Sequence, residues 1–388
     1  MKNDAFQNGA TWCRADFHLH TKADKEFVYT GEENFYFSSY VDALANADIG
    51  IGIITNHNKF DFEEFKALSS TAKKQNIFLL PGIELSVNDG ANGIHTLIVF
   101  SDEWLKNGQN HINPFLNVAF EGKIPANYES KNGRSSLNLM NTIKKLEDYH
   151  KDFFLVFAHV EQSSGLWTAL DGGRLRELGQ DDFFKHRALG FQKVSTHDKP
   201  DAKCRTKVKD WLGKAYPAEV EGSDPKKIDE IGAGERCFLK LGAFTFEAVK
   251  FALIDHENRL RLKNVPKRTN SHIRQIRFEG GMLDGETIRF SPELNVLIGI
   301  RGSGKSSVLE ALRYALDIRL EANAHDREYK QKLVAWTLGS GGKVVIDATD
   351  RHGQSFQIRR IWKENTDVFK FVCAGTTRKR DGRRSRGV

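Results

Sequence analysis

Two histidines separated by a single residue, His18 and His20, lie at the end of a short apolar stretch near the start of the chain. Side chains alternate between the two faces of a strand, so both imidazoles would point to the same side. Two imidazoles placed in this way can bind one metal ion, because histidine is the commonest metal ligand. The alternative is a pair of surface residues on a strand, so the interpretation needs support from elsewhere in the chain.

Several other apolar runs also end in residues that can bind a metal. They finish in Thr55-Asn56-His57, Gly82-Ile83-Glu84, Ala158-His159 and Gly222-Ser223-Asp224, and a further run begins at His95. Three imidazoles and two carboxylates suit Zn, Mn or Fe and hydrolytic chemistry. A carboxylate such as Glu84 could bridge two ions. The candidate ligands, with the first pair, are His18, His20, His57, Glu84, His95, His159 and Asp224.

A second kind of chemistry is indicated by residues 299–306, GIRGSGKS, which match the phosphate-binding pattern GxxxxGK[ST]. Glycines let backbone N–H groups surround a phosphate, and the helix N-terminus adds its positive dipole end. Lys305 would reach the β- and γ-phosphates of ATP, and Ser306 would bind Mg²⁺. A glycine-rich turn without a ligand is the alternative interpretation. The candidate nucleotide-binding residues are Gly299, Arg301, Gly302, Ser303, Gly304, Lys305, Ser306 and Ser307.

The elements that must position these residues follow a β–α alternation from about residue 14 to 255, which predicts an α/β fold with a parallel sheet or barrel. In β/α barrels, active residues gather where strands end. Beyond a polar stretch broken by Pro266, the segments IRQIRFEG, ETIRF and LNVLIGI are predicted strands, Lys305 to Leu320 a helix, and 343–362 a hairpin that turns at 351–353. The predicted domains are 1–258, a linker at 259–270, a P-loop domain at 271–370 and a basic tail at 371–388.

Composition narrows the class of protein. The 388 residues include 39% hydrophobic and 28% charged residues, ordinary values for a folded domain and too apolar for wholesale disorder. The start lacks a signal-peptide pattern and no apolar run is long enough to span a bilayer, so we expect a cytoplasmic protein without membrane contact. Much of the net charge of +7 lies in the basic end RKRDGRRSRG, which is either a solvated charge run or an attachment point for nucleic acid.

The metal-competent residues of 14–255 resemble those of the PHP (polymerase and histidinol phosphatase) domain, which implies a distorted β/α barrel and a phosphoesterase metal cluster. By this resemblance His18, His20, Glu84 and Asp224 hold one ion, and Glu84, His95 and His159 hold a second. The third position of the family corresponds here to Asp24, His57 and Lys226. Lysine replaces the usual histidine at 226, and Asn56 stands where the family's motif has an aspartate, so this sequence departs twice from the pattern.

The sequence around the P-loop resembles the N-terminal part of ABC-type ATPases of the SMC, RecF and RecN kind. A PHP domain followed by such a module resembles the TrlF family of AAA-like ATPases over about residues 14–362. The resemblance implies a longer protein, so we expect the chain to carry one ATPase lobe, to pair with a C-terminal lobe in trans or to dimerise, and to bind ATP with Mg without appreciable turnover alone.

These observations support one leading hypothesis and two alternatives. The first is a metal-dependent phosphoesterase, and specifically a nuclease, coupled to ATP and acting on nucleic acid in DNA repair or phage defence. His18, His20, Glu84, His159 and Asp224 are then the catalytic candidates. The second is an ATP-binding, nucleic-acid-associated module in which the barrel is a scaffold without activity. The third is an inactive, truncated fragment.

Overall fold

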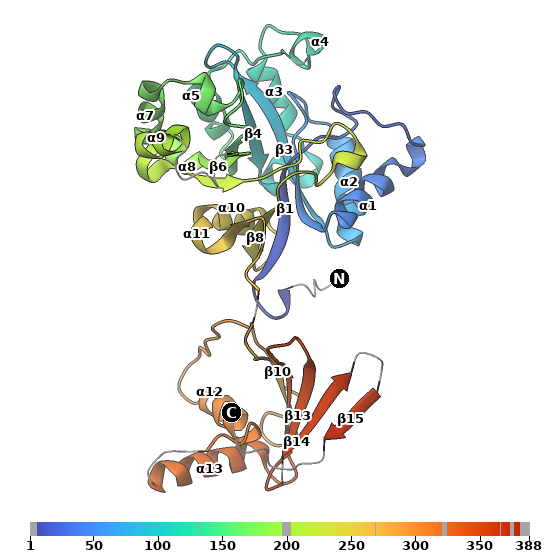
Figure 1. Ribbon diagram of the computed structural model, residues 1–388, viewed down its shortest axis with the longest axis vertical. Helices are drawn as coiled ribbons and strands as arrows, with labels where there is room; N and C mark the ends of the chain where they lie inside the picture. The colour runs from blue at the N-terminus through green and yellow to red at the C-terminus, as the bar shows by residue number, and fades with distance from the viewer. Residues whose placement is uncertain are drawn as a thin grey trace. The chain divides into compact units, whose positions relative to one another are not determined.

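The structure, a computed structural model, describes residues 6–130, 132–195, 203–267, 269–319, 324–364, 366–372 and 376–380. The chain divides into two compact units. The first unit is Thr11–Val265, and the second consists of Met1–Ala10 with Pro266–Val388. Figure 1 draws the first in blue to yellow and most of the second in orange to red. Among the described residues, no helix combines the length and apolar character needed to cross a membrane.

A nine-stranded sheet forms the centre of the first unit, in the order β7-β6-β5-β4-β3-β2-β1-β8-β9. Seven strands run in one direction, because β1–β2, β2–β3, β5–β6 and β6–β7 pair in parallel, while β4 and β8 are each antiparallel to both neighbours. The strands are β1 (Thr11–Leu19), β2 (Ile49–Ile54), β3 (Phe78–Val87), β4 (Ile94–Phe100), β5 (Phe153–Phe157), β6 (Ala188–Gln192), β7 (Ala218–Val220), β8 (Cys237–Leu241) and β9 (Leu260–Leu262).

The sheet nearly closes on itself at β1. The first half of β1 pairs with β8, but further along, the N–H of Phe17 donates to the carbonyl of Glu221 at 3.1 Å, and the N–H of Asp224 donates to the carbonyl of His18 at 2.9 Å. A Cβ on Gly222 would lie 2.6 Å from the backbone nitrogen of His18, so only glycine permits this approach. The predicted barrel-like α/β architecture is therefore present in the first unit.

Helices cover the outside of this sheet, and its central strands are buried on both faces, whereas the edge strands are partly exposed. All five side chains of β5, FFLVF, are buried, each contributing about 1.5–3 kcal/mol through apolar burial. In Figure 1, α1 and α2 lie beside β1 and β2, and α10 lies against β8. The helices of eight or more residues are α1 (Tyr36–Asn46), α2 (Phe62–Lys74), α3 (Ile112–Ala119), α5 (Leu139–Glu147), α7 (Gly172–Gln180), α9 (Lys203–Leu212) and α10 (Phe246–Ile254).

Shorter helices complete the connections of the first unit. The α-helical ones are α4 (Pro125–Tyr128), α6 (Leu166–Ala169), α8 (Asp182–Arg187) and α11 (His256–Arg259). The 3-10 helices are η2 (Glu33–Phe35), η3 (Asp102–Gly108), η4 (Gly213–Ala215) and η5 (Ile228–Glu230). Several of the longer helices begin with a side-chain cap. Asp61 accepts from the N–H of Glu64 at the start of α2, and Asp171 accepts from the N–H of Arg174 at the start of α7.

The second unit contains a six-stranded antiparallel sheet in the order β11-β10-β12-β13-β14-β15, packed against two helices. The β12–β13 hairpin turns at residues 351–353, as predicted. The elements of the second unit are β10 (His272–Glu279), β11 (Thr287–Arg289), α12 (Lys305–Ala315), α13 (Ala324–Leu338), β12 (Lys343–Thr349), β13 (Ser355–Ile361), β14 (Thr366–Val372) and β15 (Thr376–Arg380).

The segment LNVLIGI, predicted to be the strand before the P-loop, is not a strand. No described strand pairs with it, and Leu294 and Ile298 are 89% and 90% exposed. Leu297 alone is in contact with the core of the second unit. The apolar pattern of the segment therefore does not produce a strand among the described residues. The following helix also ends earlier than predicted, at Ala315, because Asp317 takes a positive φ of 55°.

Several further elements were not anticipated from the sequence. Strands β6 and β8 were missed, β9 lies inside the range 259–270 that we interpreted as a linker, and α13 lies between the P-loop helix and the hairpin. Leu260 and Leu262 in β9 pair with the edge of β8, and this contact explains the additional strand. Strands β14 and β15 extend into the range 371–388 interpreted as a tail, of which 373–375 and 381–388 lie outside the described residues.

Candidate functional site

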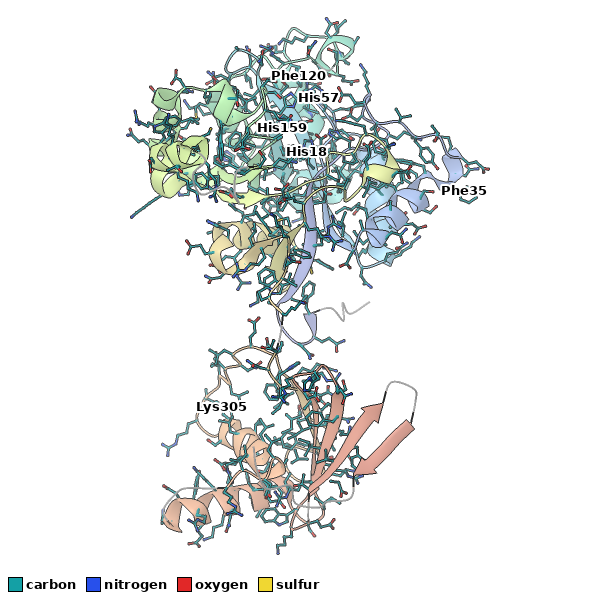
Figure 2. All side chains as sticks on the ribbon, viewed as in Figure 1. His18, Phe35, His57, Phe120, His159 and Lys305 are labelled. Carbon is teal, nitrogen blue, oxygen red and sulfur yellow. The ribbon has the colours of Figure 1, made fainter. Side chains whose placement is uncertain are left out.

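The ends of six parallel strands lie at one rim of the first sheet, and the start of the reversed strand β4 lies there too. This topology brings histidines from β1, the segment after β2 and the segment after β5 close together, as the labels of His18, His57 and His159 show in Figure 2. Glu84 lies inside β3, which continues beyond the end of β2. The N–H of Asn58 donates to the carbonyl of Glu84 at 2.8 Å, so the backbone of Glu84 is fixed on both sides.

One group of side chains surrounds Oε2 of Glu84. The Nε2 atoms of His18 and His20 lie 3.4 Å and 3.7 Å from this oxygen, and Nε2 of His20 lies 3.0 Å from Oδ1 of Asp224. His18 is fully buried, and its Nε2 has no hydrogen-bond partner among the described residues. A buried imidazole nitrogen without a partner costs free energy, and a metal ion at this point would remove that cost.

A second group surrounds Oε1, the other oxygen of the same carboxylate. Nδ1 of His95 lies 2.8 Å from Oε1 of Glu84, and Nε2 of His159 lies 3.5 Å from it. The candidate ligand atoms within each group lie within 4.8 Å of one another, for His18, His20 and Glu84 in the first and for Glu84, His95 and His159 in the second. Glu84 thus has the position of a carboxylate that bridges two ions.

Residues behind the candidate ligands hold the imidazoles in orientation. Oδ2 of Asp24 lies 2.8 Å from Nδ1 of His20, and Oε1 of Gln192 lies 3.2 Å from Nδ1 of His18. With Nδ1 bonded in this way, Nε2 of each ring is directed toward Glu84. Carboxylate or amide partners of this kind are typical behind metal-binding histidines, where they fix the ring and its tautomer.

The electrostatic state of the site is that of an anion surrounded by imidazoles. Burial alone would raise the pKa of Glu84, but His18, His159 and His95 hold it well below its ordinary value. Burial would lower the pKa of His20, whereas its hydrogen bonds to Asp224 and Asp24 raise that pKa to about 9. The carboxylates are therefore held in their anionic form, and a metal ion bound beside them would supply the compensating positive charge.

The backbone near the ligands adopts conformations that non-glycine residues rarely take. His159 has φ 30°, Asp224 has φ 53° and Lys193, directly after β6, has φ 55°. Such conformations cost on the order of 1 kcal/mol or more and gather at functional sites. They aim side chains from the strand ends that a regular strand would direct elsewhere.

The three residues aligned with a third metal position are placed differently. Asp24 accepts from the N–H of His57 at 2.6 Å as well as bonding His20, so its oxygens are already engaged. His57 lies beside His95, with ring centroids 5.3 Å apart, but belongs to neither group of candidate ligands in the described structure. The ammonium of Lys226 lies 3.1 Å from Oδ1 of Asp224 and 3.2 Å from Glu26, so a lysine supplies a fixed positive charge there.

Sequence inspection missed residues whose role depends on the folded sheet. Gln192 also accepts from the N–H of His159 and donates to the carbonyl of Gly222, so it connects three strand ends. Asp16 accepts from the N–H of His18 and from both the N–H and the hydroxyl of Ser223, which fixes the turn that carries Asp224. The only signal for Gln192 in the sequence is a polar amide at the end of the apolar run ALGFQ.

The P-loop lies at the start of α12 in the second unit. Gly302 and Gly304 have φ 84° and 85°, which side chains other than hydrogen would disfavour, and Gly304 precedes the helix. The ammonium of Lys305 donates to the carbonyls of Gly299 and Ile300, each at 2.7 Å, and lies 3.3 Å from Oγ of Ser303. Ser307 is buried beneath the loop, whereas Arg301, Gly302 and Ser306 are exposed.

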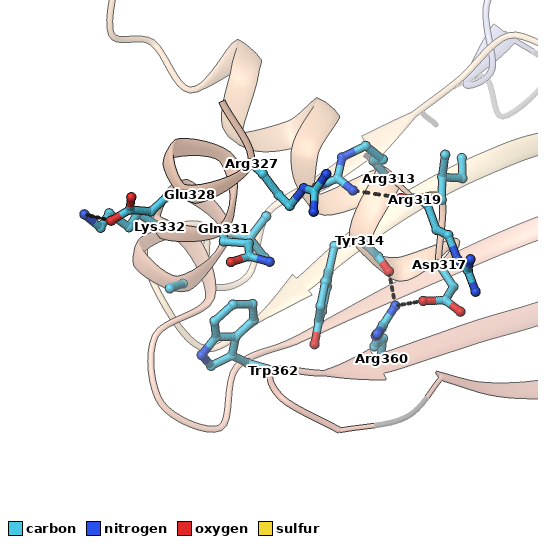
Figure 3. A pocket seen from close by; sticks show the side chains of 13 residues that line it. Arg313, Tyr314, Asp317, Arg319, Arg327, Glu328, Gln331, Lys332, Arg360 and Trp362 are labelled. Atoms are coloured by element: carbon cyan, nitrogen blue, oxygen red, sulfur yellow. Dashed lines mark hydrogen bonds and ion pairs between the residues drawn. The ribbon is translucent and has the colours of Figure 1, made fainter. Parts of the chain in front are cut away.

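A cavity of about 800 Å³ lies at the C-terminal end of α12, away from the P-loop at the N-terminal end of this helix (Figure 3). It is therefore not the nucleotide site. The guanidinium of Arg360 stacks 4.0 Å from the ring of Tyr314 and pairs with Asp317 at 3.0 Å. Arg313 pairs with Glu310 at 2.6 Å. Because these cations already have protein partners, the cavity indicates no particular ligand.

Comparison with known proteins identifies an AAA domain at residues 246–384, which includes the P-loop. Two crystal structures share distant similarity with the chain. PsfC of Pseudomonas syringae is 14% identical, with 60% of this chain and 83% of that chain covered and a TM-score of 0.37. A Bifidobacterium adolescentis protein, provisionally named a metal-dependent phosphoesterase, is 13% identical, with 55% and 88% covered and a TM-score of 0.36. No protein with a curated description matches the sequence.

Proposed function

We propose that this chain is a metal-dependent phosphoesterase that acts on nucleic acid, coupled to ATP binding by its AAA domain. The observation that carries the proposal is the position of Glu84, with one carboxylate oxygen facing His18 and His20 and the other facing His95 and His159. Two ions bridged by a carboxylate are typical of enzymes that hydrolyse phosphate esters.

Each side chain of the site has a distinct role under this proposal. The residues that would hold two ions are rich in imidazole, which favours Zn, Mn or Fe over Mg. When bound, such ions generate a nucleophile from water at neutral pH and neutralise phosphate oxygens. Asp24 and Gln192 orient His20 and His18. The proposed ion-binding residues are His18, His20, Glu84, His95, His159 and Asp224.

Lysines beside Asp224 provide the charge for a phosphate group. Lys226 lies 3.1 Å from Oδ1 of Asp224, and Lys193 lies 3.6 Å from Oδ2. The side chains of Lys226 and Lys193 are 39% and 33% exposed, so both lysines are accessible to a substrate at the proposed ion site. Nonbridging phosphate oxygens are strong acceptors for such donors.

The AAA domain gives the second half of the proposal. ATP with Mg²⁺ would bind residues 299–307, where Lys305 would exchange the carbonyls of its own loop for phosphate oxygens. Two phosphate-directed sites in one chain support a nucleic-acid substrate and a role in DNA repair or phage defence. The order of the two units also supports membership of the TrlF family, with an ATPase lobe in trans or a second copy as partner.

The test is hydrolysis by the purified chain loaded with Mn²⁺ or Zn²⁺, assayed on bis(4-nitrophenyl) phosphate and on single- and double-stranded nucleic acid, with and without ATP. We expect metal-dependent cleavage that His18→Ala abolishes. His186→Ala is the matched control, because this histidine is exposed on α8, where its Nδ1 bonds the carbonyl of Asp182 in the same helix. Absence of cleavage of every substrate at full metal occupancy would refute the catalytic proposal.

One observation favours a second candidate, a scaffold without activity. Lys226 and the engaged Asp24 leave the third metal position without an assembled set of ligands. Elemental analysis separates the candidates: two ions per chain support the phosphoesterase, and an empty barrel after purification and incubation with metal supports the scaffold.

A further inference from the structure

A small polar pocket opens beside His95, on the side of the candidate metal centre that holds Oε1 of Glu84. Its volume is about 290 Å³, at the lower limit of ligand pockets. Besides His95, its lining comes from four separate segments of the first unit and consists of Ser86, Asn92, Asn132, Arg134, Ser163 and Ser164.

Backbone hydrogen bonds fix the walls of this pocket. The N–H of His95 donates to the carbonyl of Ser164 at 3.0 Å, which holds the segment after β5 against β4. The N–H of Ser135 donates to the carbonyl of Ser86 at 2.8 Å, which holds the segment of Arg134 against β3. The shape of the pocket is thus set by the same strands that position the candidate ligands.

Two features leave this pocket open to a ligand. Ser86 is 2% exposed overall, yet it is one of the residues that line the pocket. A Cβ on Gly93 would lie 3.1 Å from the hydroxyl oxygen of Ser86 and 3.3 Å from Cδ of Arg134, in a backbone with φ 76°. Glycine at 93 therefore leaves open the space between the hydroxyl and the guanidinium, where a ligand could bond to both.

The chemistry of the lining restricts the ligand. Among the described residues that line the pocket, none is acidic or aliphatic, and Arg134 is the single permanent cation. The one aromatic ring is the imidazole of His95, which is held at the candidate metal centre with its Nδ1 2.8 Å from Oε1 of Glu84. Hydroxyl and amide groups suit a sugar, while a nucleobase would require an apolar or aromatic surface for stacking. One N–H of Arg134 donates to the carbonyl of Ala91 at 2.9 Å, and the guanidinium has further donors for an anion.

We infer that this pocket binds the sugar–phosphate unit next to the scissile phosphate of a nucleic acid, and that it does so without contact to the base. The sugar hydrogen-bonds to the serine and asparagine side chains, and the neighbouring phosphate binds Arg134. This inference rests on the proposed function, because the scissile phosphate must bind at the ions beside His95. It makes the substrate a polynucleotide read through its backbone.

The inference is tested by calorimetric binding to the full chain loaded with Mn²⁺, in a Lys305→Ala background that removes the P-loop contribution. The probes are inorganic phosphate, thymidine 3′,5′-bisphosphate and the abasic tetrahydrofuran 3′,5′-bisphosphate. We expect both bisphosphates to bind about tenfold more tightly than inorganic phosphate, which corresponds to one charge-assisted contact, and to differ from each other by less than about twofold.

Two variants act on the pocket by different means. Arg134→Met removes the cation, and Ser163→Phe fills the pocket from an exposed position; each should reduce the tenfold preference to near unity. Arg174→Met is the matched control, since Arg174 pairs with Glu177 on the surface of α7, and should keep the preference. Rescue of the preference by Arg134→Lys would assign the effect to charge.

Three results would overturn the inference. Bisphosphates that bind no better than inorganic phosphate exclude the subsite while leaving the phosphoesterase proposal intact. Thymidine bisphosphate that binds tenfold better than the abasic probe shows a base-reading site instead. Inorganic phosphate that fails to bind the metal-loaded chain refutes the proposed function, and the inference falls with it.

Discussion

The two units differ in how completely each prepares its site. In the first unit four of the six candidate ligands are buried and two are partly buried, and Asp24, Gln192 and Asp16 hold the site by hydrogen bonds. In the second, the segment before the P-loop is exposed and unpaired, and Lys305 bonds the carbonyls of its own loop. The comparison shows that the first site is organised before its ligand arrives, whereas the second must exchange internal contacts for phosphate.

The largest effect is expected from Glu84→Ala, which removes the group shared by both sets of imidazoles. We expect both ions to be lost and phosphoesterase activity to fall by about a thousandfold or more, since the ions supply the nucleophile. Elemental analysis measures the first effect and a bis(4-nitrophenyl) phosphate assay the second. Glu177→Gln, on the surface of α7, is the control. Retention of two ions in Glu84→Ala would break the comparison at its strongest point.

Lys305→Ala tests the less organised site. Loss of a charge-assisted contact to the β- and γ-phosphates should weaken ATP binding about 10- to 100-fold, measured with a fluorescent ATP analogue. Limited proteolysis should show cleavage between 293 and 304 that ATP with Mg²⁺ slows in the parent chain and not in the variant. Lys332→Ala, on the exposed face of α13, serves as the control. Protection that is complete before ATP is added would show that this loop is also preorganised.

Asp24→Asn sharpens the account of the first unit. Asp24 is assigned to hold His20 rather than to bind an ion, so the variant should keep two ions at saturation but bind them about 10- to 100-fold more weakly. Titration with Mn²⁺ into the metal-free protein measures this. If Asp24→Asn instead lowers the number of ions bound at saturation, Asp24 is a ligand and the third position is assembled after all.

The smallest effect concerns the outside of the same unit. Asp152 pairs with Lys250 of α10 and Arg187, and although burial would raise its pKa, these cations lower it. A lowered pKa means that the stabilisation is present above the ordinary value near 3.9 and is lost as pH falls through the folded value. Asp152 is more than a third exposed, so screening limits the effect to about 0.5–1 kcal/mol.

This stabilisation is measured by urea unfolding at pH 7 and pH 3. Lys250→Met should reduce the free energy of unfolding by that amount at pH 7 and by less at pH 3. Lys145→Met removes an exposed pair with Asp148 and is the matched control. An equal loss at both pH values would assign the effect of Lys250 to packing instead of charge.

The elements predicted correctly from the sequence are those whose hydrophobic residues form a clear periodic pattern. The alternation around His18 and His20 predicted their strand, and apolar runs predicted β2 to β5 and β7. Helix α13 was missed because its first ten residues, AHDREYKQKL, carry little apolar periodicity. LNVLIGI was predicted as a strand because its pattern is that of a strand, but a strand also needs a neighbour, and pattern alone cannot supply one.

For the candidate site, residue types could be predicted from the sequence, but their geometry could not. His18, His20, Glu84, His95, His159 and Asp224 lie together, and their role as ligands stays a prediction. Residue type alone could not distinguish Asp24 and His57 from these six candidate ligands. The distinction depends on the hydrogen bonds that Asp24 forms with the ring of His20 and with the N–H of His57. Gln192 and the pocket beside His95 depend on contacts between distant segments, which no spacing in the sequence reveals.

The seam at Gly222 has a mechanical consequence. The turn of residues 221–224 forms backbone hydrogen bonds with β1 and also carries Asp224. The two backbones are so close that a methyl group at position 222 would clash with the backbone of His18. Any motion that opens the seam would therefore move Asp224 away from the proposed ion site. Conversely, an ion bound by Asp224 would hold the turn of residues 221–224 against β1, so we expect the melting temperature to rise with free metal concentration as mass action requires.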